Sequence, residues 1–380
     1  MKQKIAIYTL TSELHDSEAV NSVTEQFLTS LGIDYELKGN DYADYGDSGL
    51  SMIYVCTGGT EGIFLKLLPM LLEKSRRPFY LLTSGKSNSL AASMEILAYL
   101  KQHNMIGEII HGSPEYIARR IGQLARIEDI FRRLNGTRLG IIGKPSDWLI
   151  ASEADKEKVR EHLGIELIDI PMQTLLDAIK ERDNNIYEAL KDVIATYRLQ
   201  GFTLRCFDLL TTVKDTGCMA LARLNSEGYV AGCEGDVPAM LSMTITRVLT
   251  GVSGFQANPA NINPETGELL FAHCTIPLDM VEHYETDTHF ESGIGTAVRG
   301  YVKPGHVTIF KMAGDLSRCF VAEGELLECL SKPNLCRTQQ LIRLCNKEQA
   351  AYFLNNPIGN HHIIMPGHWQ ELIEKVFSKR

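Results

Sequence analysis

Apolar runs of strand length alternate with helical segments along the first third of the chain. The runs that predict buried strands are Lys4–Leu10, Ser51–Thr57, Phe79–Thr83 and, more weakly, Glu108–Ile110. The segments whose apolar residues recur at helical spacing are Ser17–Leu31, Thr60–Leu72, Ser87–Gln102 and Pro114–Leu134. Strands separated by helices of this length predict βαβ units, and therefore a parallel sheet.

The same alternation begins again after Asn135-Gly136, which we take as a domain boundary. Strands are expected at Arg138–Ile142, Glu166–Pro171, Thr203–Leu209 and Tyr229–Cys233. Helices are expected at Glu153–Leu163, Tyr187–Gln200 and Pro238–Leu249. The repeated order predicts a second α/β unit of the same kind as the first.

The pattern changes after Gly251, where glycine and proline become frequent. Segments that alternate between apolar and polar positions predict antiparallel strands at Thr296–Tyr301, Val307–Met312 and Arg318–Glu323. We therefore predict an α/β protein with two Rossmann-like doubly wound domains, over residues 1–135 and 136–251. A β-rich, barrel-like C-terminal domain is expected to follow over residues 252–380.

Composition and charge restrict the partners and the location of the protein. The chain has 380 residues, a formal net charge of -9 and 44% apolar residues, as in soluble globular proteins. The acidic balance argues against a nucleic-acid partner. The sequence contains no secretory segment and no run of about 18 apolar residues, so we expect a cytoplasmic protein without a membrane partner. Nine scattered cysteines without a Cys-x-x-Cys pair indicate reduced thiols.

Two distant polar motifs suggest a site for a divalent cation. Glu234 and Asp236 follow the apolar run Tyr229–Cys233, and Gly235 between them allows the backbone to turn. This places carboxylates at the C-terminal edge of a strand, where open α/β sheets bind ligands. Far along the chain, His361 and its neighbour precede another apolar run. A carboxylate and an imidazole from distant segments are ligands that a divalent cation needs.

These motifs and three further segments resemble the L-fucose/L-arabinose isomerase superfamily, specifically its shorter fucose isomerase-like branch. The segments that carry the resemblance are Gly143–Leu149, Gly232–Asp236, Ala272–Thr275, His289–Gly293 and Gly359–His362 with Pro366–His368. The resemblance implies a metal-dependent aldose–ketose isomerase that acts on a small-molecule sugar through an ene-diol. It also implies a requirement for Mn²⁺, or another divalent cation such as Mg²⁺, and assembly as a homo-trimer or homo-hexamer.

By this resemblance Glu234 is a metal ligand that also takes part in proton transfer, although capping or salt bridging is its alternative role. His361 matches the C-terminal metal histidine of the family. Because adjacent residues of an extended segment face opposite ways, we expect His362 to pack or to contact substrate instead. We predict that folding brings Glu234 and His361 within about 8 Å of each other, close enough to share one cation. Asp236 is interpreted as the N-cap of the helix that begins near Pro238.

The sequence departs from the family at Asn258, where an Asp is common. An asparagine can still offer a carbonyl oxygen to a metal, so we keep Asn258 as a candidate metal ligand and catalytic residue. It cannot act as a carboxylate base. The candidates for the missing carboxylate are Glu265, Glu268 and Glu291.

Five further residues are candidates for the site, and most of them have a structural alternative. His273 matches a metal ligand of the long-chain arabinose isomerases, but a histidine on an apolar strand is often a hydrogen-bonded core residue. Trp148 and Ser146 are expected near the sugar, where an aromatic face packs on C–H bonds, unless Trp148 is a core residue. His289 and Glu291 would bind substrate as a polar pair or form an exposed ion pair.

Two other functions remain open at this point. Loss of a carboxylate at Asn258 is what a non-catalytic sugar-binding or sugar-sensing protein on the isomerase scaffold would show. A cofactor-independent racemase would instead use Cys56 and Cys218 as paired acid and base, although buried cysteines are usually small core residues.

Overall fold

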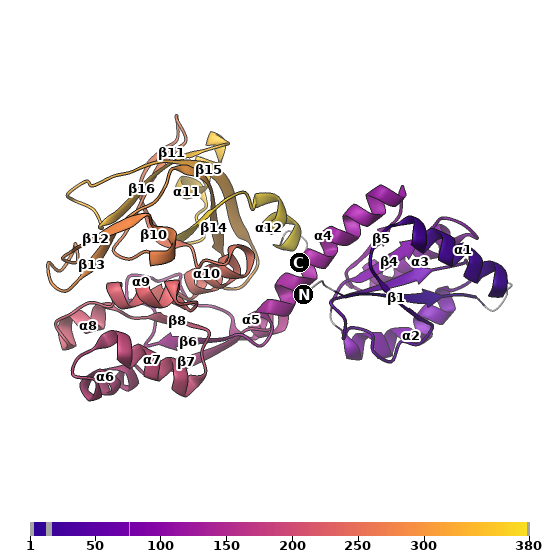
Figure 1. Cartoon of the computed structure of the whole chain (residues 1–380), viewed down its shortest axis with the longest axis horizontal. Coiled ribbons are helices and arrows are strands. Elements are labelled where there is room, and N and C mark those ends of the chain that lie inside the picture. The colour runs from indigo at the N-terminus through magenta and orange to yellow at the C-terminus, as the bar shows by residue number, and fades with distance from the viewer. Residues whose placement is uncertain (1–3, 13–16, 76, 378–380) are drawn as a thin grey trace. The chain divides into compact units, whose positions relative to one another are not determined.

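The computed structural model describes residues 4–12, 17–75 and 77–377, and the chain divides into two compact units between Arg132 and Arg133 (Figure 1). The first unit holds a five-stranded parallel sheet in the order β2-β1-β3-β4-β5. Its strands are β1 (Ile5–Leu10), β2 (Glu36–Gly39), β3 (Leu50–Val55), β4 (Phe79–Thr83) and β5 (Gly107–Ile110). The helices are α1 (Ser17–Ser30), α2 (Glu61–Lys74), α3 (Ser89–Gln102) and α4 (Pro114–Leu134). All of β4 is buried, as expected for a strand covered on both faces.

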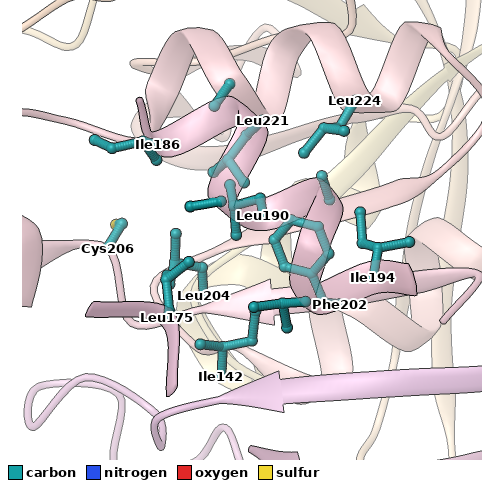
Figure 2. Packing of buried hydrophobic residues seen from close by; sticks show 14 of the residues in the cluster. Ile142, Leu175, Ile186, Leu190, Ile194, Phe202, Leu204, Cys206, Leu221 and Leu224 are labelled. Atoms are coloured by element: carbon teal, nitrogen blue, oxygen red, sulfur yellow. The ribbon is translucent and has the colours of Figure 1, made fainter. Parts of the chain in front are cut away.

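The second unit begins with a four-stranded parallel sheet in the order β7-β6-β8-β9. The strands are β6 (Arg138–Ile142), β7 (Glu166–Ile170), β8 (Gly201–Leu204) and β9 (Val230–Cys233). The helices are α5 (Lys156–Leu163), α6 (Met172–Glu181), α7 (Ile186–Tyr197), α8 (Phe207–Thr212), α9 (Cys218–Ser226) and α10 (Val237–Thr250). Figure 2 shows the apolar core of this sheet, in which Phe202 and Leu204 of β8 pack with Leu190 and Ile194 of α7.

A closed antiparallel barrel follows, with strands in the order β10-β11-β16-β15-β14-β17. Its strands are β10 (Phe255–Asn263), β11 (Glu268–His273), β14 (Gly305–Met312), β15 (Cys319–Cys329), β16 (Thr338–Leu344) and β17 (His362–Pro366). The remaining elements are β12 (His283–Asp287), β13 (Ala297–Tyr301), α11 (Ala351–Asn355), α12 (Gln370–Phe377) and two 3₁₀ turns, Leu278–Met280 and Lys347–Ala350. The core of the barrel is largely apolar and includes Phe255, Phe271 and Ile309.

The α/β class with parallel sheets and the β-rich C-terminal part are confirmed. The doubly wound, Rossmann-like arrangement and the three-domain division stay predictions. The expected strand Thr203–Leu209 is wrong in its second half, because β8 ends at Leu204 and α8 begins at Phe207. Within the described part of the chain, no helix is both long enough and apolar enough to span a bilayer.

Candidate metal centre

Three buried side chains from distant segments meet at one end of the barrel. Glu234 follows β9, His273 ends β11, and His361 directly precedes β17. One Glu234 oxygen, Oε1, lies 3.6 Å from His273 Nε2 and 3.5 Å from His361 Nε2. One possible ligand atom from each of the three residues lies within 4.8 Å of the others. The prediction that folding brings Glu234 and His361 together is therefore confirmed.

The turn after β9 sets the position of Glu234. The backbone of Glu234 is left-handed, with φ of 61°, and Gly235 follows with φ of 72°. A Cβ atom on Gly235 would lie 2.5 Å from the Lys144 carbonyl oxygen, so only glycine fits here. The Glu234 carbonyl oxygen accepts a hydrogen bond of 2.9 Å from the Ser146 amide. A non-glycine residue held in this conformation is strained, and such strain is concentrated at functional sites.

Barrel register places the histidines beside each other. In the β10–β11 pair, Asn258 lies opposite Ala272, the residue before His273. In the β10–β17 pair, Ala257 lies opposite His362, the residue after His361. The three strands therefore bring Asn258, His273 and His361 to the same end of the barrel, and the two imidazole rings are 5.3 Å apart.

The donor atoms of this cluster fit a divalent cation. Both ring nitrogens of His273 and Nε2 of His361 are buried and have no hydrogen-bond partner among the described residues. Buried polar atoms rarely stay unpaired, and a cation would satisfy one nitrogen of each ring. One carboxylate with two imidazoles suits a divalent transition metal better than Mg²⁺, which prefers oxygen ligands.

The ionisation of the cluster shows that it attracts positive charge. Burial acts to raise the pKa of Glu234, but the charge of His361 and the nearby His273 imidazole hold that pKa well below its usual range. Burial acts to lower the pKa of His361, but the nearby Glu234 and Asp236 carboxylates raise it to about 9. The carboxylate of Glu234 is therefore available as an anionic ligand at neutral pH.

A pocket opens beside the cluster. Besides cysteines, its lining residues are Phe207, Glu234, Asn258, His273, His289 and Glu291. The Trp148 indole donates a hydrogen bond of 2.8 Å to Glu234 Oε2, and its ring meets Phe207 edge-on at 4.7 Å. The His289 ring meets Phe207 edge-on from 5.5 Å. The pocket thus combines candidate cation ligands, an aromatic wall and two further polar groups.

Other candidate residues from the sequence lie in different surroundings. His362 is fully buried, with its ring nitrogens 2.8 Å from the Asn360 carbonyl oxygen and 3.1 Å from the Tyr352 hydroxyl, a position that favours packing. Glu265 is exposed in the β10–β11 turn, and Glu268 pairs with Arg343 on the barrel surface. Of the three candidates for the missing carboxylate, Glu291 is the one that lines the pocket. Ser146 is buried beside the Glu234 turn.

Asp236 has a second role that the sequence analysis missed. Its Oδ1 accepts a hydrogen bond of 2.8 Å from the Ala239 amide, which confirms the predicted N-cap of α10. Its Oδ2 also lies 2.9 Å from Nδ1 of His361 and 3.3 Å from the Lys311 ammonium group. The spacing Glu234-x-Asp236 was the only local signal for this contact.

Five cysteines line the same pocket, another feature that the sequence analysis missed. They are Cys206, Cys218, Cys233, Cys274 and Cys336. The Cys206 and Cys233 sulfurs are 3.1 Å apart, and all nine cysteines are free thiols in the described ranges. The two cysteines of the racemase hypothesis belong to different units, and burial raises the pKa of both the Cys56 and Cys218 thiols. A raised pKa keeps a thiol protonated, so neither cysteine is activated as a base. This does not favour the racemase hypothesis.

Together the fold and the cluster define an α/β protein in which the C-terminal barrel and the turn after β9 form a candidate centre for a divalent cation. No protein-family model matches the chain. It is similar to sulfoquinovose isomerase from Priestia aryabhattai, with 22% identity over 350 residues, covering 80% of this chain and 77% of the relative. The protein of the same name from Priestia megaterium gives the same values. Sulfoquinovose isomerase from Clostridium sp. (strain MSTE9) is 21% identical over 197 residues, 43% of this chain and 44% of the relative.

Proposed function

We propose that the protein is a metal-dependent aldose–ketose isomerase of the fucose/arabinose type that acts on a sugar through an ene-diol. The observation that carries this proposal is the buried cluster of Glu234, His273 and His361 beside a pocket. Similarity to proteins named sulfoquinovose isomerase over most of the chain supports it independently. Membership of the fucose isomerase-like branch is part of the same proposal.

The residues of the pocket can be assigned roles in moving a proton between C1 and C2 of a sugar. Glu234, His273 and His361 would hold Mn²⁺, with the Asn258 amide oxygen as a fourth ligand. The ion would stabilise negative charge that develops on the sugar oxygens. Glu234 is the proposed proton carrier, and Glu291 is the carboxylate placed to assist it. Trp148 and Phe207 offer an aromatic surface for the sugar, while His289 can bind a hydroxyl group.

The name of the relatives widens the set of sugars to be tested. Sulfoquinovose is a hexose with a sulfonate group, so it belongs in the screen beside fucose and arabinose. We also propose a cytoplasmic location, the three-domain division and a homo-trimer or homo-hexamer. These proposals rest on the sequence patterns and the family resemblance.

Metal content and turnover test the proposed function together. Elemental analysis of the purified protein, followed by a Mn²⁺-supplemented screen of aldoses, should give about one bound ion per chain and a ketose product. EDTA should remove the activity, and Mn²⁺ should restore it. Absence of Mn²⁺ binding in calorimetry would contradict the proposed site.

A sugar-binding or sensing protein is the second candidate, and Asn258 is the observation that favours it. Its oxygen Oδ1 accepts a hydrogen bond of 2.7 Å from the side-chain amide of Asn360, so the position is hydrogen-bonded but uncharged. A sugar that binds in the presence of Mn²⁺ and is never converted would support this second function.

Asn258→Asp is expected to tighten Mn²⁺ binding on the order of tenfold, because a charged ligand replaces a neutral one near a cation. The new carboxylate can still accept the hydrogen bond from Asn360, so the fold should be unaffected. Calorimetry measures the affinity, and an isomerase should also gain turnover whereas a sensor should gain affinity alone. Unchanged affinity would show that Asn258 does not face the cation.

A further inference from the structure

Lys311 is a fully buried lysine whose ammonium group lies behind the candidate cation ligands. It is on β14, in alternation with Val307 and Ile309, whose side chains belong to the apolar core of the barrel. Residues two apart on a strand face the same side, so Lys311 points into the barrel interior. Its side chain is 0% exposed. A buried lysine is costly unless it is paired, which calls for an explanation of its presence.

The partner of Lys311 is Asp236, and the contact continues to the metal centre. The Lys311 ammonium lies 3.3 Å from Asp236 Oδ2, which is also 2.9 Å from His361 Nδ1. The opposite nitrogen of that ring, Nε2, is the one that faces Glu234. Asp236 is 0% exposed as well, so neither charge is shared with solvent. The three residues come from β14, the β9–α10 turn and the position directly before β17.

The Asp236 carboxylate is held by donors on both of its oxygens. The Ala239 amide donates to Oδ1, and the Lys311 ammonium donates to Oδ2. The Ser242 hydroxyl on α10 accepts a hydrogen bond of 2.9 Å from the Met312 amide, so α10 and β14 are tied together beside this contact. The orientation of the carboxylate determines which nitrogen of His361 it engages, and so which nitrogen is left for a ligand.

We propose that Lys311 is a positioning residue for the metal centre: it holds Asp236 in the orientation that directs Nε2 of His361 toward Glu234 and His273. Lys311 touches neither sugar nor cation, and acts only through Asp236. The inference rests on the metal site of the proposed function. It assigns a role to the one charged side chain on β14 that faces the barrel interior, a role that neither the motifs nor the relatives indicate.

The sign of the effect on metal affinity separates positioning from simple electrostatics. A lysine near a cation repels it, so loss of the charge alone would tighten Mn²⁺ binding. Loss of a group that orients a metal-binding histidine weakens binding, typically by about 10- to 100-fold. Lys311→Met keeps the approximate length of the side chain without its charge. We expect it to weaken Mn²⁺ binding by about 10- to 100-fold in calorimetry with Mn²⁺ alone.

Two further measurements make the assignment specific. Pulsed electron paramagnetic resonance of the Mn²⁺-loaded protein should show coupling to two imidazole nitrogens in the wild type and a weakened second coupling in Lys311→Met. Ile309→Val on the same face of β14 is the matched control and should change the Mn²⁺ affinity less than about twofold. In an Asp236→Asn background, Lys311→Met should have no additional effect beyond about twofold, because its partner is already altered.

Three outcomes would overturn the inference. Unchanged or tighter Mn²⁺ binding by a folded Lys311→Met protein would leave Lys311 a purely structural residue. If Lys311→Met weakened Mn²⁺ binding as much in the Asp236→Asn protein as in the wild type, Lys311 would not act through Asp236. If Lys311→Met does not fold, Lys311→Gln retains a donor and should show a smaller loss, while tighter binding by this variant overturns the role. Wild-type protein that binds no Mn²⁺ would instead refute the proposed metal site before any variant is compared.

Discussion

Glu234→Gln is expected to abolish sugar isomerisation, with a loss of at least about 100-fold, because the variant lacks both the anionic ligand and the proposed proton carrier. Mn²⁺ affinity should fall more than about tenfold when the negative charge is removed. The amide oxygen of glutamine can still accept the hydrogen bond from the Trp148 indole, so the local geometry should survive. Turnover, calorimetry with Mn²⁺ and thermal unfolding of the metal-free protein measure these three effects.

A suitable control is Glu166→Gln, since Glu166 pairs with Arg138 at the surface of the second sheet and lies outside the pocket. This control should keep full turnover and metal affinity. Glu234 would be a structural residue if Glu234→Gln retained activity but lost a large part of its metal-free stability. The measurement thus separates a residue that acts through its charge from one that acts through packing.

Phe202→Ala is expected to lower the free energy of unfolding by about 3–5 kcal/mol, the range for truncating a buried phenylalanine. The ring is 0% exposed and packs in the core between β8 and the helices of the second sheet (Figure 2). In the β8–β9 pair Phe202 lies opposite Ala231, three residues before Glu234. Damage to this core should therefore also loosen the turn that presents Glu234, and lower Mn²⁺ affinity.

Urea unfolding followed by circular dichroism measures the stability, with the transition of the second unit analysed separately because the chain has two compact units. Ile150→Ala is the control in the same unit. Its side chain is 94% exposed, so its loss should cost less than about 0.5 kcal/mol. A loss below about 1 kcal/mol in Phe202→Ala would mean that the core rearranges to fill the space.

Local sequence patterns around particular residues predicted several features of the site. The run Tyr229–Cys233 followed by Glu234 and Gly235 correctly predicted a strand, a sharp turn and a carboxylate at its end. The sequence also predicted that the side chains of His361 and His362 point in opposite directions, because adjacent residues of an extended chain face opposite sides. His361 faces Glu234, while His362 contacts Tyr352. All of these features depend on residues close together in sequence.

Features that depend on the register of the barrel strands could not be predicted from local sequence. His273 could be a core residue or a ligand until the pairing of β10 with β11 and β17 brought it beside His361. The segment Thr203–Leu209 mixes apolar residues with the charged Arg205 and Asp208, and this pattern alone could not show where β8 ends and α8 begins.

The sequence by itself determined the α/β class, the β-rich C-terminal part and two members of the cluster, Glu234 and His361. Strand periodicity, glycine turns and caps are local properties, so they can be read from neighbouring residues. Tertiary structure alone decided that His273 joins Glu234 and His361, that five cysteines line the adjacent pocket, and that Lys311 reaches Asp236. Lys311 and Asp236 are separated by 75 residues, and a lysine near the end of a strand has no local pattern that distinguishes burial from exposure. Only closure of the barrel against α10 removes both charges from water and thereby requires them to pair.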